Sequence, residues 1–263
     1  TFFTKLKNFY FDEYYAKDDV CRKSKYLRLY NFFLKIIRKK IYRIFWGRVC
    51  FKLNKKNRYF VYFLHKAPEA GINIKGMLYE NELQNIVNIS RVLEKDDILV
   101  IKEHPTDEGN KPMSFYKTLN KLPNISLVSS FHKSTVLEKD FEAGFTISGT
   151  IAIDMGLKGQ LCLTFGDNWF NFIPWVKKIS YDDLRHNSIN DIIENRVKSN
   201  LALINKLHKL IDSISFKGDV NDFEIYPYKN NDKNINDLVN SFELFMSYHV
   251  LKNTDDLNKE LLE

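Results

Sequence analysis

The sequence is poor in cysteine, which argues against a fold held together by disulfide bonds or by a structural zinc ion. Its 263 residues contain Cys21, Cys50 and Cys162 as the three cysteines. They are odd in number and widely spaced, and none belongs to a CxxC or Cys/His pattern with zinc-binding spacing. Several histidines also lack metal-binding spacing with Asp or Glu: His132, His186, His208 and His249. We therefore expect reduced thiols in a cytosolic compartment and no bound metal.

Long apolar runs are also missing. No stretch of about 18 uncharged apolar residues occurs, so a membrane-spanning helix is not expected. The chain opens on Thr1 instead of Met and has no signal-peptide pattern, so we expect a fragment or a processed product. A composition of 44% hydrophobic and 28% charged residues is typical of a soluble globular protein with a sizeable core.

Acidic residues are absent from one segment, Arg22–Arg58, which contains fourteen Lys and Arg residues. The net charge of the chain is +7, so the remainder, with 26 basic and 33 acidic residues, has a charge of −7. Within the segment, apolar residues recur at steps of three and four, and basic residues fall mostly between them. The apolar positions are Tyr26, Leu29, Tyr30, Phe33, Ile37, Ile41, Ile44 and Phe45, and the basic ones are Arg28, Lys35, Arg38, Lys39 and Arg43. This pattern predicts a basic amphipathic helix.

Two interpretations of this helix remain open. It lies on an anionic membrane surface, where each basic residue near the lipid contributes about 1 kcal/mol; or it docks on the rest of the domain and its charges form a solvated face. We expect no nucleic acid partner, because no RNP, zinc-finger or helix-turn-helix signature accompanies the charge.

From residue 59 onward, strand patterns alternate with helix patterns. Apolar, β-branched and aromatic runs predict strands at 59–65, 97–105, 124–130, 143–150 and 160–166. Helical spacing of apolar residues predicts helices at 80–94, 113–122, 134–140 and 151–158. This alternation predicts a Rossmann-like α/β fold, with a parallel sheet and helices on both faces. Two amphipathic helices, at 199–214 and 235–251, are expected to close the fold around a polar loop at 217–234.

Polar residues or glycine follow each of the five predicted strands. They are His65, Lys102–Pro105, Ser129–Ser130, Ser148–Thr150 and Phe165–Gly166. Because parallel strands bring their carboxyl ends to one edge of a sheet, we expect these residues to surround a single ligand site.

The chemistry of this edge favours a phosphorylated ligand. In the stretch SGTIAIDMG (148–156), Gly149 allows close approach of the backbone, and Ser148 or Thr150 is expected to cap the helix that follows. Amides and the dipole at the start of a helix favour an anion. Lys102 and His104 are expected to add charge-assisted hydrogen bonds to the same phosphates.

These stretches resemble the capsule polysaccharide biosynthesis family, which includes Kdo transferases. The resemblance covers approximately residues 59–172: a strand with LHxxPE (64–69), a KEHP strand end (102–105), an SGT turn (148–150) and a strand ending in FG (165–166). It implies one half of a GT-B glycosyltransferase, the carboxyl-terminal domain that binds the nucleotide-sugar donor. A GT-B enzyme also has an amino-terminal acceptor domain of comparable size; because only residues 1–58 precede the first predicted strand, we expect this domain to be either missing from the chain or rudimentary.

The resemblance implies roles for several residues. An HP pair that helps bind the donor phosphate corresponds to His104 and Pro105, and a nearby SS or ST turn corresponds to Ser148 and Thr150. The acidic residue after the GT turn is usually Glu in the family, whereas this chain has Asp154. With Lys102, Gly149 and Gly166, these residues form the expected donor-binding set.

Catalysis is assigned to the LHxxPE loop. Glu69, beside His65, is the expected general base or binds an acceptor hydroxyl; alternatively, Glu69 pairs with Lys66 or caps a turn. Glu103 points to the opposite side of its strand from Lys102, so we interpret it as structural. Five aromatic residues are expected either to stack on a base or sugar or to be buried beneath the loop: Phe165, Trp169, Phe170, Phe172 and Trp175.

We therefore expect three regions: a basic helical segment (1–58), a nucleotide-sugar-binding domain (59–216), and a polar loop with a closing helix (217–263). The expected function is transfer of a sugar from a pyrimidine nucleotide, such as CMP-Kdo, to a saccharide or lipid-linked acceptor. No cofactor is required, because basic residues and the helix dipole can neutralise the leaving phosphate. The expected location is the cytoplasmic face of the cell membrane, bound through residues 22–58. The alternatives are a CDP-glycerol-type polyol-phosphate transferase and a non-catalytic nucleotide-binding module.

Overall fold

The structure is a computed structural model. It describes residues 25–45, 56–66, 74, 76–105, 107–128, 141–194, 196–219 and 231–247. The predicted helix at 134–140, the Ser129–Ser130 strand end and the expected catalytic Glu69 lie outside the described residues.

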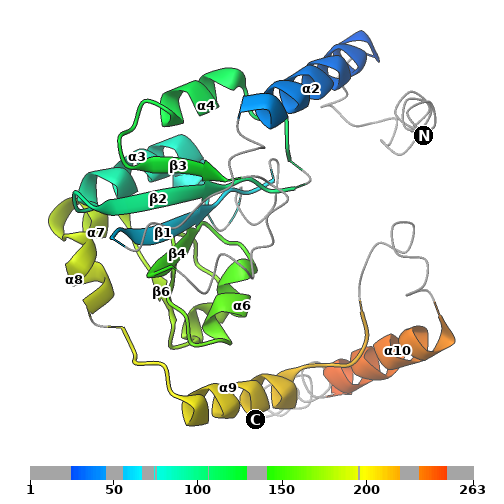
Figure 1. The fold of residues 1–263 in the computed structure, drawn as a ribbon. Coiled ribbons are helices and arrows are strands. Elements are labelled where there is room, and N and C mark those ends of the chain that lie inside the picture. Colours follow the sequence, from blue (N-terminus) through cyan, green and yellow to red (C-terminus); the bar gives the residue numbers. More distant parts are fainter. Residues whose placement is uncertain are drawn as a thin grey trace, which may run out of the picture. The chain divides into compact units, whose positions relative to one another are not determined.

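The centre of the chain is a single six-stranded sheet in which every neighbouring pair of strands is parallel (Figure 1). The strands are β1 (Arg58–Phe63), β2 (Asp97–Lys102), β3 (Ile125–Val128), β4 (Ala143–Thr146), β5 (Cys162–Thr164) and β6 (Val176–Lys178). Their spatial order is β3-β2-β1-β4-β5-β6, the order of doubly wound nucleotide-binding folds. The predicted Rossmann-like fold is confirmed.

The sequence did not predict β6. This strand lies at one end of the sheet, and Lys177 and Lys178 are exposed on it. An edge strand with charged residues carries no apolar run, and such residues protect a sheet edge from pairing with other chains. The five predicted strands are present but shorter than expected.

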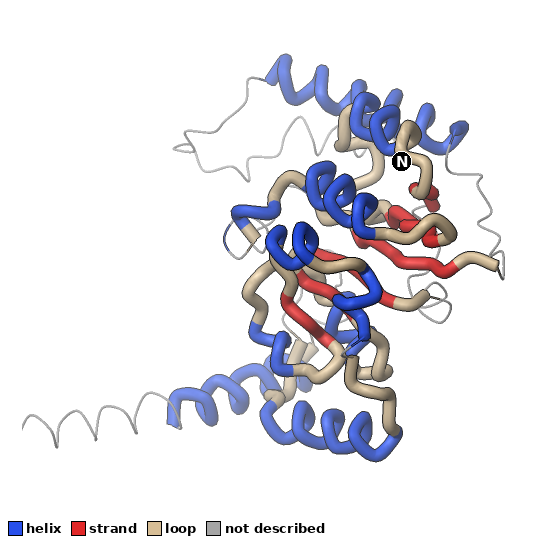
Figure 2. The backbone as a smooth tube through the Cα atoms, turned by 90° about the vertical axis from the view of Figure 1, so that its left-hand side faces the viewer, coloured by secondary structure: helices blue, strands red, loops and turns tan. Residues whose placement is uncertain are grey.

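Helices surround the strands (Figure 2). In chain order these elements are η2 (Met77–Tyr79), α3 (Glu82–Val92), α4 (Met113–Leu119), α6 (Ile151–Gly156), η4 (Trp169–Phe172), α7 (Tyr181–His186) and α8 (Ile189–Glu194). Residues Tyr59 to Phe63 of β1 are all buried, although successive side chains point to opposite faces. Both faces of the sheet are therefore covered, as parallel sheets require.

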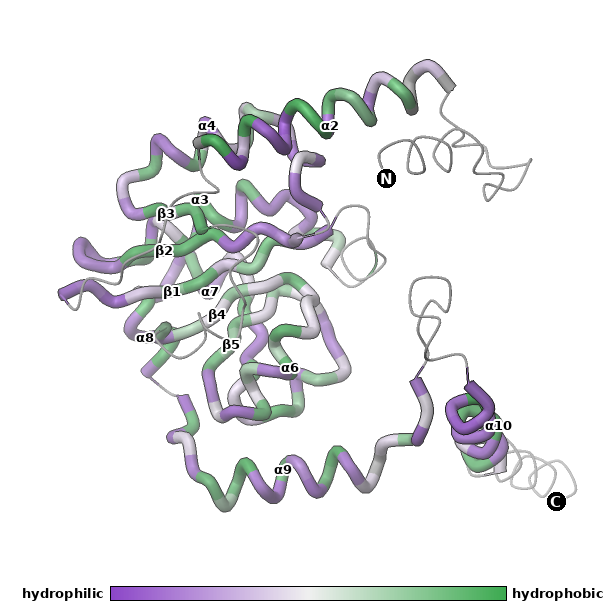
Figure 3. The backbone as a smooth tube through the Cα atoms, turned by 45° about the vertical axis from the view of Figure 1, so that its right-hand side comes forward, coloured by the Kyte–Doolittle hydropathy of each residue, from purple (hydrophilic) through white to green (hydrophobic). Residues whose placement is uncertain are grey.

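The predicted basic helix is present as α2 (Lys25–Phe45), and hydrophobic and hydrophilic residues alternate along it (Figure 3). Its carboxyl-terminal part contacts the sheet domain. The Tyr42 side chain is 1% exposed, and its hydroxyl donates to the backbone oxygen of Val128 at 3.1 Å. Arg43 and Lys39 form ion pairs with the buried carboxylate of Glu108. The docking interpretation therefore accounts for part of the basic charge.

The helices that the structure describes are too short or too polar to cross a membrane.

The chain divides into two compact units, Thr1–Ile204 and Asn205–Glu263. Helix α9 (Leu201–Ile214) spans the boundary, and α10 (Asp232–Met246) lies in the second unit. Within this second unit, Asn234 bonds to both backbone groups of Asp219, and the Ser241 hydroxyl donates to the backbone oxygen of Lys217 at 2.6 Å. The two amphipathic helices predicted near the carboxyl terminus are thus present.

Candidate functional site

A cavity of about 260 Å³ opens at the carboxyl ends of β1, β2 and β4. Its lining residues are Phe63, Leu64, His65, Lys102, Glu103, His104, Pro105, Thr146, Gly149, Thr150, Ile151 and Asp154. The cavity lies at the point where the strand order reverses, between β1 and β4, which is where open α/β sheets bind ligands.

The structure brings most of the predicted donor-binding residues together at this cavity. Those that line it are Lys102, His104, Pro105, Gly149, Thr150 and Asp154, and His65 joins them. Ser148 and Gly166 are not among the lining residues. Gly166 is instead held by hydrogen bonds: its amide donates to the backbone oxygen of Ile147 at 2.8 Å, and its carbonyl accepts from the side-chain amide of Asn168 at 3.0 Å.

Lys102 is the last residue of β2 and is 3% exposed. Its Nζ donates to the backbone oxygen of Glu103 at 3.2 Å. Burial lowers the pKa of Lys102 to about 8, because a charged amine loses its hydration there.

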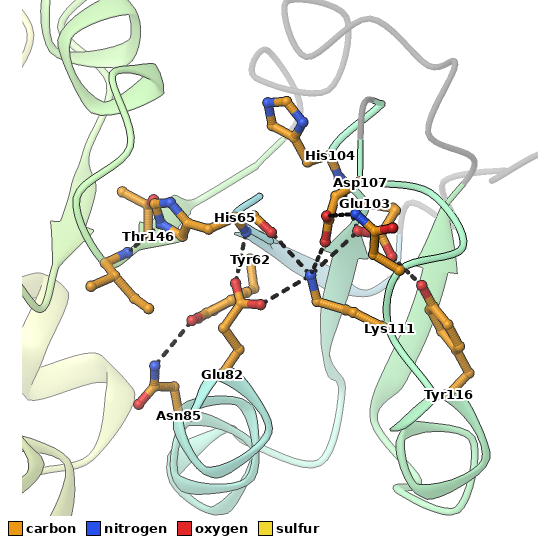
Figure 4. Close-up of polar contacts among 12 residues, drawn as sticks. Tyr62, His65, Glu82, Asn85, Glu103, His104, Asp107, Lys111, Tyr116 and Thr146 are labelled. Carbon is orange, nitrogen blue, oxygen red and sulfur yellow. Dashed lines mark hydrogen bonds and ion pairs between the residues drawn. The ribbon is translucent and has the colours of Figure 1, made fainter. Parts of the chain in front are cut away.

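Glu103 and His104 diverge at the end of the strand. The Glu103 carboxylate accepts from the Tyr116 hydroxyl and from the backbone N–H of His104. The His104 ring projects away from this buried cluster (Figure 4). Burial raises the pKa of Glu103. The carboxylate of Glu103 thus belongs to the support of the strand end, as the alternation of side chains predicts.

Beside the cavity lies a buried group of four charged residues, which we call the Lys111 cluster: Glu82, Glu103, Asp107 and Lys111. Glu103 also lines the cavity. The Lys111 Nζ lies 3.2 Å from a Glu82 oxygen, 3.6 Å from a Glu103 oxygen and 3.0 Å from an Asp107 oxygen (Figure 4). Burial alone would lower the pKa of Lys111, but the three carboxylates outweigh it and raise this pKa above its usual value.

Sequence reasoning missed this cluster. Its members come from α3, the end of β2 and the loop before α4, and they share no motif; the nearest signal is the i, i+4 spacing of Asp107 and Lys111. Among the described residues, no group of three or more His, Cys, Asp or Glu is arranged to hold a metal ion.

His65 connects the Lys111 cluster to the turn after β4. Its backbone N–H donates to Glu82 at 2.7 Å, and its backbone oxygen accepts from Lys111 at 3.0 Å. Its ring Nε2 lies 2.8 Å from the Thr146 hydroxyl and 3.0 Å from the amide nitrogen of Ile147. The side chain is 5% exposed.

The expected capping of α6 is wrong. Thr150 is the N-cap residue, but it makes no side-chain capping bond, because its helical backbone (φ −62°, ψ −14°) turns the hydroxyl away from the next amides. The Ser148 Oγ is buried and has no hydrogen-bond partner among the described residues. Thr146 instead provides the side-chain acceptor for the backbone in this turn, since its Oγ1 accepts from the Gly149 amide at 3.2 Å. Helix α6 has only six residues, so we assign no anion site to its dipole.

Gly149 is required by close packing in this turn. A Cβ at this position would lie 2.6 Å from the Thr146 Oγ1 and 3.4 Å from the His65 Cε1. Any larger residue would push the turn into the cavity or break the bond from the Gly149 amide to Thr146.

The aromatic loop after β5 divides into two sets. Phe165, Phe170 and Trp175 are buried and form part of the support of the fold. Trp169 and Phe172 are 60% and 47% exposed, with ring centroids 6.3 Å apart. Neither exposed ring lines the cavity, so the stacking interpretation gains no support at this site.

No protein-family model matches the sequence. No curated protein matches it either.

Solved structures do show similarity. A UDP-GlcNAc 2-epimerase from Methanocaldococcus jannaschii has 19% identity and a TM-score of 0.42, over 72% of this chain and 53% of that chain. KpsC from Thermosulfurimonas dismutans, a β-Kdo 2,7 transferase, has 12% identity and a TM-score of 0.42, over 74% and 59% of the two chains. A glycotransferase of kitacinnamycin has 14% identity and a TM-score of 0.35, over 64% and 41%.

A Kdo transferase is thus among these structures. The matched region spans 53% and 59% of the length of the epimerase and of KpsC.

Proposed function

We propose that this chain is the donor-binding part of a glycosyltransferase that acts on a pyrimidine nucleotide sugar. The observation that carries the proposal is the convergence of Lys102, His104, Gly149, Thr150 and Asp154 on one cavity at the switch point of the sheet. A buried amine and an imidazole there suit the phosphates of a nucleotide, and no metal or cofactor is needed to bind them. The sugar is transferred to a saccharide or lipid-linked acceptor of surface polysaccharide synthesis.

Calorimetry with CMP, CDP, UDP and CMP-Kdo tests the donor site. We expect saturable binding that His104→Ala weakens by about 1.5–3 kcal/mol, the usual worth of a hydrogen bond to a charged group. His186→Ala is the matched control, because His186 is an exposed histidine that does not line this cavity. Equal affinities of wild type and His104→Ala would remove His104 from the site. Preference for CDP-glycerol over nucleotide sugars would favour the polyol-phosphate transferase.

The proposed catalytic base is Glu69. A carboxylate within hydrogen-bond reach of the acceptor hydroxyl contributes about 10²–10⁴-fold to the rate. Glu69→Gln is expected to lower turnover while leaving donor affinity nearly unchanged. Wild-type turnover in this variant would contradict the assignment, and nucleotide binding without any transfer would favour a non-catalytic module or a base in another domain.

We also propose that residues 22–58 hold the chain on the anionic inner face of the cell membrane. Support comes from large side chains on α2 that are exposed and recur at steps of three, four and seven: Tyr26, Tyr30, Phe33, Ile37 and Ile44. At about 100° per residue these positions share one side of the helix, opposite Tyr42 and Lys39, which contact the domain. An amphipathic helix of this kind binds lipid through its apolar side.

Cosedimentation with liposomes tests this membrane contact. Binding to anionic liposomes is expected to fall with added salt and to be lost in the double variant Phe33→Ser, Ile37→Ser. Asn31→Ser is the control, because Asn31 is exposed on the same helix away from the apolar positions. Equal binding to neutral liposomes, or none to either, would leave α2 as a docking helix only.

A further inference from the structure

His65 is fixed on three sides by groups from different parts of the fold. Its backbone N–H and oxygen are held by Glu82 and Lys111, at 2.7 and 3.0 Å. Its ring Nε2 faces the turn after β4, at 2.8 Å from the Thr146 hydroxyl, 3.0 Å from the Ile147 amide and 3.5 Å from the Ser148 amide. Figure 4 shows the ring pointing at Thr146 and the backbone pointing at the Lys111 cluster.

The partners of Nε2 determine its chemical state. A backbone amide can only donate, so the bond from Ile147 requires Nε2 to be the unprotonated nitrogen, and the ring proton then belongs on Nδ1. The Thr146 hydroxyl completes the arrangement, because it donates its one proton to Nε2 while its oxygen accepts from Gly149. The lone pair of Nε2 is therefore already engaged, and this nitrogen is poorly suited to take a proton from an acceptor hydroxyl.

The same bonds set the shape of the turn that borders the cavity. Nε2 fixes the amide of Ile147, and through Thr146 it fixes the amide of Gly149. Gly149 packs so closely on Thr146 that a Cβ would lie 2.6 Å from the Thr146 hydroxyl oxygen, with the His65 ring in ordinary contact at 3.4 Å. Without the ring, the Ile147 amide loses its acceptor, and the Thr146 hydroxyl that accepts from the Gly149 amide loses its own acceptor, so the position of Gly149 and Thr150 in the cavity wall is no longer determined.

We infer that His65 is a positioning residue: its Nε2 holds the turn of residues 146–149 in the conformation that places Gly149 and Thr150 in the wall of the proposed donor cavity. The Lys111 cluster in turn holds His65, so the KEHP strand end and the SGT turn are set as one unit through Lys111 and His65. This inference rests on the proposed function for its ligand, but the hydrogen bonds that it invokes belong to the protein alone. It replaces the expectation that His65 belongs with Glu69 to the catalytic residues.

Two substitutions separate a positioning role from a catalytic one. In His65→Gln, the side-chain Oε1 can replace Nε2 as the acceptor but cannot act as a base near neutral pH; in His65→Leu, the acceptor is lost. Hydrogen exchange of the amides of Ile147 and Gly149 is measured first, followed by affinity for UDP and CMP and by the pH profile of turnover. His186→Leu serves as the control for the loss of a histidine.

We expect exchange at Ile147 and Gly149 to rise about tenfold or more in His65→Leu, the ratio that corresponds to loss of about one hydrogen bond, and to stay near wild type in His65→Gln. Nucleotide affinity should follow the same order, and the pH profile of His65→Gln should match that of wild type. If His65→Leu does not fold, Thr146→Val removes the hydroxyl link with little change in shape and should raise exchange at Gly149 alone.

Other outcomes would overturn either the positioning role of His65 or the proposed donor function. Unchanged exchange in His65→Leu, or loss of turnover to the same extent in both variants with the turn still protected, would overturn the positioning role. The expected exchange pattern without nucleotide binding to wild type would confirm that His65 holds the turn and would contradict the proposed donor function instead.

Discussion

The carboxylate of Glu108 accepts two hydrogen bonds from the guanidinium of Arg43, at 2.9 and 3.2 Å. The Glu108 side chain is 1% exposed, whereas that of Arg43 is 46% exposed. Lys39 adds a second ion pair to the same carboxylate at 3.2 Å. One buried anion therefore anchors the carboxyl-terminal part of α2 to the loop before α4.

Glu108→Gln should release this part of α2. The variant removes the charge that Arg43 and Lys39 contact, and both of these half-exposed cations can return to water, so we expect a loss of about 1–3 kcal/mol. Hydrogen exchange of residues 35–45 would measure the release, with exposed Glu194→Gln as the control. Unchanged exchange would mean that the burial of Tyr42 is sufficient to hold the helix.

Nucleotide binding should depend on pH through Lys102. Its pKa of about 8 means that the amine is charged below pH 8 and neutral above it. A bound phosphate favours the charged amine, so binding above pH 8 must take up a proton, and affinity should fall by up to about tenfold per pH unit. Calorimetry at pH 7–9.5 in buffers of different ionisation enthalpy would show this uptake. Lys102→Met should abolish the pH dependence and exposed Lys95→Met should not; a pH-independent wild type would exclude contact between Lys102 and phosphate.

Lys111→Met should destabilise the domain strongly. The substitution leaves Glu82, Glu103 and Asp107 buried near one another without their cation, a type of change that costs about 3–5 kcal/mol. Denaturant unfolding would measure the loss, with Lys117→Met on the exposed side of α4 as the matched control. Equal losses in the two variants would contradict a structural role for the cluster.

Ser148→Ala distinguishes binding from stability at the turn. The Ser148 hydroxyl is buried without a partner among the described residues, so its removal should leave the free energy of unfolding unchanged or raise it by up to about 1 kcal/mol. If the hydroxyl contacts the donor phosphate, nucleotide affinity should fall in the same variant. Ser114→Ala, at an exposed serine, controls for the substitution itself. A loss of stability without a loss of affinity would show that the hydroxyl has a structural partner.

Local patterns in the sequence predicted the elements whose residues repeat regularly. The buried run of β1 and the three- and four-residue spacing of α2 are examples, and both elements are present. The convergence of Lys102 and His104 with Gly149 on one edge followed from the parallel topology, because alternating strands and helices leave few other arrangements.

Contacts between distant segments were not predictable in this way. Lys111 meets Glu82 and Glu103 only after α3 and β2 have been placed, and no spacing along the chain encodes that meeting. The cap of α6 failed for a related reason. Thr146 lies before the turn; its hydroxyl accepts from the Gly149 amide and also contacts the His65 ring, which follows another strand, β1.

The central place of β1 in the sheet has a consequence for synthesis of the chain. One edge of β1 pairs with β2, which follows soon after it, but the other edge pairs with β4, which the ribosome completes much later. Until then, Phe60, Val61 and Tyr62 present an open apolar edge to other nascent chains. Such an edge is a template for aggregation. Truncations that end between Lys102 and Ala143 should therefore precipitate, and slower translation before β4 should lower the yield of folded protein.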